Sequence, residues 1–281
     1  MQNKFIPFLL LLILLSACSG GVNIVPYHRQ LVVEGHIENG QPASVVLSYS
    51  IGLNESTDLD NLYKHIIKDA NVTISDGEKE EGLNLRRNSL GLPPFEYVST
   101  SLLGEVGKTY HLTIEHKGKI ITASTTIPKP IEIDSLWFVR DKEEERGHIQ
   151  IRFNNESALY YQLSTRVLGE EYVFSPGLYG NINSENYPAG RINLQVNRGV
   201  VIFPKSNFTT YFPDTTVVDV KLSTQDEASF KFWKSYQNEL VNSQNPIFPS
   251  TSRLESNING GVGIWCGFGS NVERIDLNEW D

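Results

Sequence analysis

Histidine is the side chain that most often acts as a general acid or base and as a metal ligand, so the six histidines are the first candidates for chemistry. None has HExxH or HxH spacing. His111 and His116 are five residues apart on a predicted hairpin, so they face opposite sides of a strand and are poor co-ligands. The serine of "GFGSN" (267–271) is misplaced for a GxSxG nucleophile turn. The sequence predicts no catalytic residue, although a surface hydrolase built on a carboxylate pair stays open.

Metal and thiol chemistry are expected to be absent as well. The acidic runs "NESTDLDN" (54–61) and "DKEEER" (141–146) lack the ligand spacing and the turn glycine of a calcium loop, so both are predicted to be solvated loops with no metal or cofactor. Cys266 alternates with Ile264 and Phe268 on one strand face, opposite Trp265, which indicates a buried structural thiol.

Cys18 is the residue whose surroundings predict a specific modification. It ends Leu15-Ser16-Ala17-Cys18, which follows an eleven-residue apolar run, Phe5 to Leu15. Spanning a bilayer takes about 20 apolar residues, so the run indicates a signal peptide and not a transmembrane helix. The pattern resembles a bacterial lipobox, which implies a diacylglyceryl thioether on Cys18, cleavage before it and acylation of the new amine. Two or more acyl chains, such as palmitate, anchor a protein stably, whereas one anchors it marginally.

Composition predicts a β-protein in a mildly acidic chain. Tyr (12) and Phe (13) are frequent, Met occurs once, and Val, Ile and Thr recur in short runs. The formal net charge is −9 and no basic run interleaves with aromatics, which argues against a nucleic-acid partner. The length of 281 residues favours two domains.

The first domain is expected over residues 30–128, after a signal peptide (1–17) and a lipidated tether (18–29). Strand-like runs occur at 31–37, 44–50, 71–77, 82–87 and 95–100, with a hairpin over 108–127 turning at Lys117-Gly118. About seven strands in about 100 residues is the density of an immunoglobulin-like or transthyretin-like sandwich.

The second domain is expected over residues 129–281, as a further β-rich unit, sandwich or barrel-like. "IPKPIEIDSLWF" (127–138) looks like a crossing between domains, because its two prolines cannot both sit in a central strand. Strands are predicted at 148–153, 159–168, 191–196, 199–204 and 216–223. One amphipathic helix is predicted near 225–242, with Thr224 and Glu227 spaced as a capping box.

Residues 175–190, rich in Gly, Asn, Ser and Pro, are predicted to be a long loop. Its Tyr179, Asn181, Asn183 and Tyr187 suit adaptable, amphipathic contacts, so this loop is the first choice for a binding surface and 141–146 the second. "DSL" (134–136) and "DTT" (214–216) resemble a short acceptor motif for O-glycosylation, which makes Ser135 and Thr215 candidate sites.

The chain also resembles a family of Bacteroidota lipoproteins catalogued as domain of unknown function 4249. The resemblance covers about residues 30 to 270 and rests on the order of "LVVEGHIENGQPASVVLSYS", "VTISDG", "GKTYHLTI", "IPKPIEIDSLWF", "YY", "FKFWKSYQNEL" and "SNINGGVGIWCGFGS". It implies anchoring in the outer membrane and gene neighbourhood with TonB-dependent transporters. It implies no activity.

These observations lead to a functional expectation. The protein is expected at the outer membrane, held by its lipid and facing the cell surface rather than the periplasm. We expect a non-catalytic accessory or binding subunit of a TonB-dependent transporter or another outer-membrane β-barrel. A structural envelope lipoprotein without a small-molecule ligand is the alternative, and a surface hydrolase is the third.

Overall fold

The computed structural model of the chain describes residues 28–52, 55–56, 58–88, 93–141, 144–199, 209–242 and 254–280. The described residues form a mainly β protein, as the sequence predicts, and Cys18 lies outside them. Their helices are α2 (Leu59–His65), α3 (Glu227–Asn242) and the short 3₁₀ turns η1 (Ser184–Asn186) and η2 (Leu277–Glu279). None of the described helices is long and apolar enough to cross a membrane.

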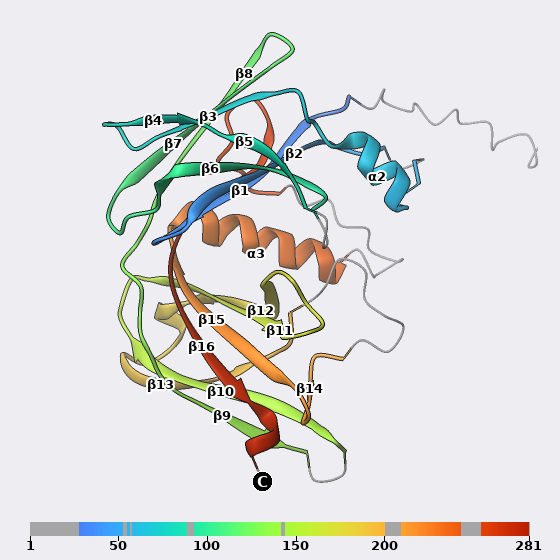
Figure 1. Cartoon of the computed structure of the whole chain (residues 1–281). Helices are drawn as coiled ribbons and strands as arrows, with labels where there is room; N and C mark the ends of the chain where they lie inside the picture. Colours follow the sequence, from blue (N-terminus) through green and yellow to red (C-terminus); the bar gives the residue numbers. More distant parts are fainter. Residues whose placement is uncertain are drawn as a thin grey trace, which may run out of the picture.

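The described strands form one large sheet and two smaller ones (Figure 1). The large sheet has the order β12-β11-β15-β16-β1-β2-β6-β5. Its strands are β1 (Leu31–Glu38), β2 (Pro42–Tyr49), β5 (Asn84–Arg87), β6 (Phe95–Leu103), β11 (Tyr160–Val167), β12 (Ser175–Asn183), β15 (Val217–Gln225) and β16 (Val262–Asp276).

Each smaller sheet is named here after its central strand. The β7 sheet has the order β4-β3-β7-β8, with β3 (Asn71–Ser75), β4 (Glu80–Gly82), β7 (Thr109–His116) and β8 (Lys119–Thr126). The β10 sheet has the order β13-β10-β14, and β9 also pairs with β10. Its strands are β9 (Ile133–Arg140), β10 (Arg146–Asn155), β13 (Gly190–Val196) and β14 (Phe212–Pro213).

Both small sheets cover the same face of the large sheet, and β16 runs under both. Successive side chains of a strand point to opposite faces. Trp265 packs in the core beneath the β7 sheet, and Ile275, ten residues further along the same strand, packs in the core beneath the β10 sheet. The fold is therefore two sandwiches that share one continuous sheet, with β16 common to both (Figure 1).

Helix α3 lies on the opposite, concave face of the large sheet (Figure 1). Ile264, Cys266 and Phe268 pack against Phe232 of the helix, which confirms the predicted strand face and the buried thiol. Burial raises the pKa of Cys266 to about 12, so the thiol is protonated and inert at neutral pH.

The predicted helix is confirmed, but its predicted capping box is wrong. The Asp226 carboxylate accepts from the backbone N–H of Ser229 at 2.8 Å and caps the helix instead. Thr224 belongs to β15, where its hydroxyl lies 2.8 Å from the carbonyl oxygen of Lys129 and 3.1 Å from that of Gly269. The threonine therefore joins the crossing segment to the sheet and not to the helix.

The segment between the two sandwiches crosses β16 at contact distance, and glycines permit this. A Cβ on Gly267 would lie 2.7 Å from the carbonyl oxygen of Thr126, and one on Gly269 would lie 2.1 Å from that of Pro128. The crossing coincides with the boundary predicted near residue 128, but Ile258 and Trp265 pack in the core of the N-terminal half. The two-domain division stays a prediction, with β16 belonging to both halves.

Two segments predicted as connections contain regular structure. Residues 133–138 of the predicted crossing belong to β9, whose register with β10 shifts between Arg152 and Phe153. Within the predicted acidic loop 54–61, Asp58 caps α2 by accepting from the N–H of Asn61 at 2.8 Å. In 127–138 the two prolines precede the strand and do not interrupt it, whereas in 54–61 short polar residues hide the helix because they occur equally in turns and in solvated helices.

Candidate functional site

The predicted binding loop 175–190 is largely a strand, and its four candidate residues do not converge. Residues 175–183 form β12, at one edge of the large sheet, and η1 follows. Tyr179 is 71% exposed and has a φ of 61°, so its ring stands away from the sheet. Tyr187 is also exposed, and its carbonyl accepts from the Asn155 side chain at 3.4 Å.

The two asparagines form hydrogen bonds within the fold. The Asn181 amide donates to the carbonyl of Phe230 at 3.0 Å, and its oxygen accepts from Gln225 at 2.6 Å. Asn181 thereby fastens β12 and β15 to helix α3. Asn183 caps η1 by accepting from the Glu185 N–H at 3.0 Å. The prediction of a long loop over 175–190 is therefore wrong, because residues 175–183 form a strand. Binding through the four candidate residues stays a prediction.

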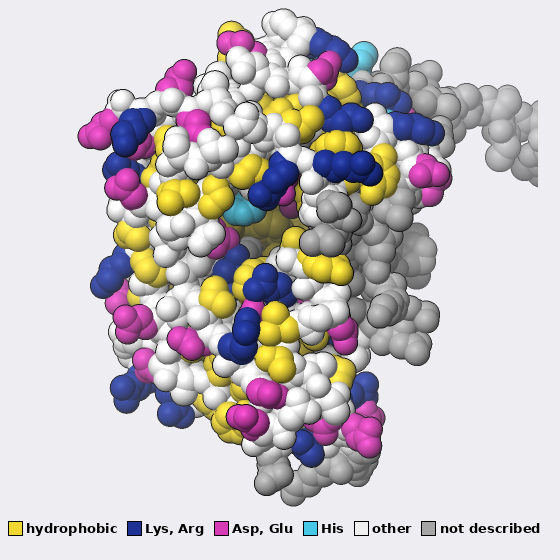
Figure 2. All heavy atoms as spheres, in the orientation of Figure 1, with side chains coloured by type: hydrophobic (Ala, Val, Ile, Leu, Met, Phe, Trp, Pro, Cys, Tyr) yellow, Lys and Arg dark blue, Asp and Glu magenta, His cyan; other side chains and the backbone are white. Residues whose placement is uncertain are grey.

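The best candidate for a binding site in the described residues is a cluster of charged side chains on the open part of the concave face. Residues at alternate positions of β1 point there, because Gly35 pairs with Trp265 on the other face. These residues are Glu34, His36 and Glu38. Figure 2 shows a hollow between the two sandwiches with a histidine, acidic groups and hydrophobic side chains on its walls.

A lysine from the other sandwich completes this cluster. The Lys221 ammonium on β15 lies 2.6 Å from a carboxylate oxygen of Glu38. Burial alone would raise the pKa of Glu38, but Lys221 and His36 beside it lower that pKa below its ordinary value. The ion pair is mostly buried on both sides, so it connects β15 to β1 across β16.

Glu34 and His36 differ from Glu38, because no described residue forms a hydrogen bond or an ion pair with either of them. Both side chains reach solvent within the hollow, yet protein atoms crowd them. This crowding raises the pKa of Glu34 and lowers the pKa of His36. A neutral imidazole can both donate and accept a hydrogen bond, so the pair is equipped to bind a polar group.

Further along the concave face, Asp219 is buried between two arginines. Arg166 lies 2.7 Å from one of its oxygens and Arg274 lies 2.7 Å from the other. Burial would raise the pKa of Asp219, and the hydrogen bonds from Arg274 and Arg166 outweigh it and lower the pKa. The Phe174 ring is contacted by Arg166 at 4.6 Å and by Lys221 at 4.5 Å, measured to the ring centroid. These cations are engaged within the protein.

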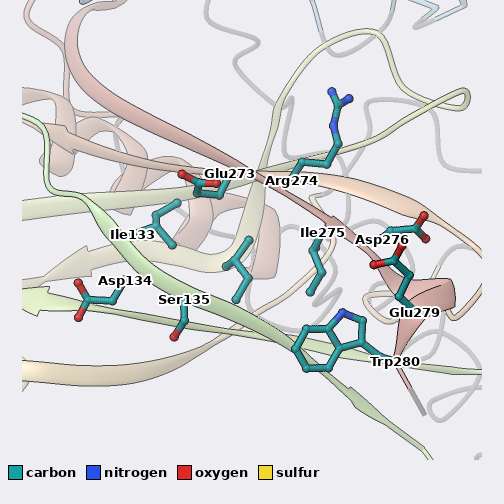
Figure 3. A pocket seen from close by; sticks show the side chains of 10 residues that line it. Ile133, Asp134, Ser135, Glu273, Arg274, Ile275, Asp276, Glu279 and Trp280 are labelled. Atoms are coloured by element: carbon teal, nitrogen blue, oxygen red, sulfur yellow. The ribbon is translucent and has the colours of Figure 1, made fainter.

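A separate pocket of about 390 Å³ opens on the flank of the second sandwich. It lies between β9 and the final part of β16, and its volume is at the low end for small-molecule sites. Figure 3 shows Asp276 and Glu279 side by side at one end, with the Trp280 ring next to them, while the Arg274 side chain points away.

The candidate O-glycosylation residues have different surroundings. Ser135 is half-buried on β9 and lines the flank pocket. Thr215 is exposed in the turn between β14 and β15. Modification at either residue stays a prediction, and Thr215 is the more exposed of the two.

The arrangement closest to catalytic geometry is a line of three side chains at one end of the first sandwich. The His116 Nε2 atom lies 3.0 Å from the Tyr49 hydroxyl, and its Nδ1 atom lies 3.6 Å from a carboxylate oxygen of Asp69. His116 is buried and joins β7 to β2, so the line functions as a structural contact. In the described part of the chain, no three His, Cys, Asp or Glu side chains are grouped to hold a metal ion.

Sequence reasoning missed the concave cluster and the flank pocket. The alternation of Glu34, His36 and Glu38 was a usable signal for a polar strand face. Lys221 could not be added, since it is 183 residues from Glu38 along the chain.

A family model described as "Domain of unknown function (DUF4249)" matches residues 22–274. No curated protein matches the chain.

Proposed function

The chain belongs to the family described as domain of unknown function 4249, and from this premise we propose that it is a non-catalytic binding subunit of an outer-membrane β-barrel complex. The lipid on Cys18 would hold it at the membrane, facing the cell surface. The resemblance of the chain to this family suggests a TonB-dependent transporter as the partner.

The observation that carries the proposal is the open concave face with Glu34 and His36. Charged side chains that reach solvent in the middle of a large sheet occupy positions where the fold could otherwise bury apolar side chains. Neither side chain forms a hydrogen bond or an ion pair with a described residue, whereas Glu38, Asp219 and Lys221 around them are all paired. Polar groups left open in a rigid surface are suited to contact a partner.

Anchoring supports the same role by confining the protein to the plane of its partner. Confinement raises the effective concentration for a co-planar partner without any tighter contact. The acidic net charge of −9 disfavours docking on anionic lipid headgroups, which makes another protein the expected neighbour.

The anchor is tested by Cys18→Ala. We expect the variant to leave the membrane fraction, because no acyl chain can then be attached. The measurement is the distribution of protein between soluble and outer-membrane fractions after a salt wash. A variant that stays with the membranes would show that the lipid is not what holds the protein there.

The contact is tested by the double variant Glu34→Ala/His36→Ala in the anchored protein. We expect barrel recovered by affinity purification from native membranes to fall at least tenfold, since the two groups offered to the partner are removed. Thermal stability should change little, because exposed side chains without partners usually contribute within about 0.5 kcal/mol.

A matched control is available on the outer face of the β7 sheet. His111→Ala/Glu115→Ala removes an exposed histidine and an exposed glutamate from one strand, β7, and should leave barrel recovery unchanged. Equal recovery with both double variants would move the contact away from the concave face. Absence of any barrel from wild-type preparations would contradict the proposed function itself.

A further inference from the structure

Strand β16 extends beyond its neighbour β1, and the edge beyond that point is not paired with any described strand. Its parallel pairing with β1 ends at Glu38 and Phe268, while β16 itself continues to Asp276. The side chain of Asn39 extends the ladder by one step, because its amide oxygen accepts from the Ser270 N–H at 2.6 Å and its amide nitrogen lies 3.3 Å from the Ser270 carbonyl oxygen. Beyond Ser270, no described strand pairs with this side of β16.

The direction of the backbone groups in this open edge follows from one hydrogen bond. The Leu277 N–H donates to the carbonyl of Thr216, the residue paired opposite it, at 3.0 Å. In an antiparallel ladder, alternate residues direct both backbone groups to the partner strand, and the others direct theirs away. The backbone N–H and C=O of Val272, Arg274 and Asp276 therefore point outward.

Strand β9 forms a second open edge on the same flank. The Asp141 N–H donates to the Arg146 carbonyl at 2.8 Å, so the backbone groups of the even-numbered residues of β9, including Leu136 and Phe138, point away from β10. Both edges border the flank pocket, with β9 in one layer of the sandwich and β16 in the other (Figure 3). The described strands thus leave this side of the second sandwich open.

The pocket between these edges has an apolar floor and an acidic rim. Ile133, Leu136 and Ile275 belong to or pack against the core of the second sandwich, and they line the pocket from both layers. Glu273 and Glu279 are exposed at its rim. The one arginine of the lining, Arg274, is paired with Asp219 and directed away from the pocket.

The edge of β16 lacks three of the usual protections against strand pairing, although it carries charged residues. Exposed edges are normally blunted by proline, by bulges or by charged side chains, lysines above all. From residue 268 to 276 the register of β16 with β15 is regular, and the segment contains no proline or lysine. Added strands gain affinity from main-chain hydrogen bonds and specificity from pockets for alternate side chains. This flank offers both.

We propose that the β9/β16 flank binds an extended segment of a partner protein, which adds to β16 as a further strand. Apolar side chains at alternate positions of the segment would face Ile133 and Ile275, and a basic side chain would face Glu273 or Glu279. The inference deepens the proposed role as a binding subunit by naming the form and chemistry of a partner segment, at a surface distinct from the concave face.

The experiment uses the purified protein and a displayed library of nine-residue peptides, followed by fluorescence anisotropy with an enriched peptide. We expect enriched peptides to alternate apolar and polar residues and to carry a basic residue. Val272→Pro should weaken their binding at least tenfold, because proline removes an outward N–H and leaves the ladder with β15 intact. Val272→Ala keeps that N–H and should change binding less than threefold.

Hydrogen exchange provides a measurement that needs no variant. On peptide binding, the amides of Val272, Arg274 and Asp276 should become protected, since they gain acceptors. Lack of enrichment, equal binding by Val272→Pro, or unchanged exchange at these three amides would overturn the proposal. Self-association that Val272→Pro abolishes would also overturn it, by assigning the edge to a second copy of the chain. Because no barrel is present, the outcome is independent of the anchoring and co-purification tests.

Discussion

Replacing Trp265 by alanine should lower the free energy of unfolding by about 3–5 kcal/mol, the range for removing a buried large aromatic side chain. Trp265 is fully buried in the core beneath the β7 sheet. Its indole N–H donates to the Tyr110 carbonyl at 3.0 Å, so truncation also leaves that oxygen without its partner. Urea unfolding followed by far-ultraviolet circular dichroism measures the change without relying on tryptophan fluorescence.

Trp137→Ala serves as the matched control. Trp137 is only half-buried on β9, at the edge of the β10 sheet, and its ring contacts the Arg152 guanidinium at 5.2 Å from the centroid. Its loss should cost about 1 kcal/mol or less, the scale of an exposed cation–π contact. If the two variants lost equal stability, Trp265 would not be the central packing residue of the first sandwich.

Local pattern was enough to predict the hairpins and the long helix. The β7–β8 hairpin turns at Lys117 and Gly118, both with positive φ, as the sequence indicates. The apolar stripe of α3 was readable because helix periodicity is a local property. The strand face of Ile264, Cys266 and Phe268 was predicted for the same reason.

Long-range pairing explains what the sequence left hidden. The parallel pairing of β1 with β16 joins the two ends of the chain, and no local pattern specifies it. Strand β12 was predicted to be a loop because Asn181 and its neighbours resemble turn residues, although Asn181 is held by Gln225 and Phe230 from distant segments.

The candidate sites share this limitation. The motif around Cys18 is local, so the sequence can propose that site, and its lipidation stays a prediction. The concave cluster needs β1 and β15 to lie on one sheet face. The open edge of β16 depends on where β1 stops, at the Asn39-Gly40 turn, relative to the end of β16. A turn can be predicted from sequence, but a difference in length between two strands distant in sequence cannot.

Gly269→Ala should cost at least 3 kcal/mol, because the added methyl group meets backbone on a crossing segment that cannot move alone. Its Cβ would lie 2.1 Å from the Pro128 carbonyl oxygen and 2.6 Å from the Thr224 hydroxyl. Overpacking in a close-packed interior typically costs about 1–3 kcal/mol, and here the crossing would also lose its contact with Thr224. Urea unfolding under the same conditions measures the loss.

Gly82→Ala is the control for backbone flexibility in the same experiment. Gly82 lies in β4 with nothing within 4 Å of the added Cβ and without a positive φ, so the change should be neutral or slightly stabilising. Each variant exchanges one strand glycine for alanine. The difference between their free energies of unfolding therefore measures the effect of the close crossing. Equal stability of the two variants would mean that the segment crosses β16 farther from its backbone. The two sandwiches would then be less tightly joined than this close crossing requires.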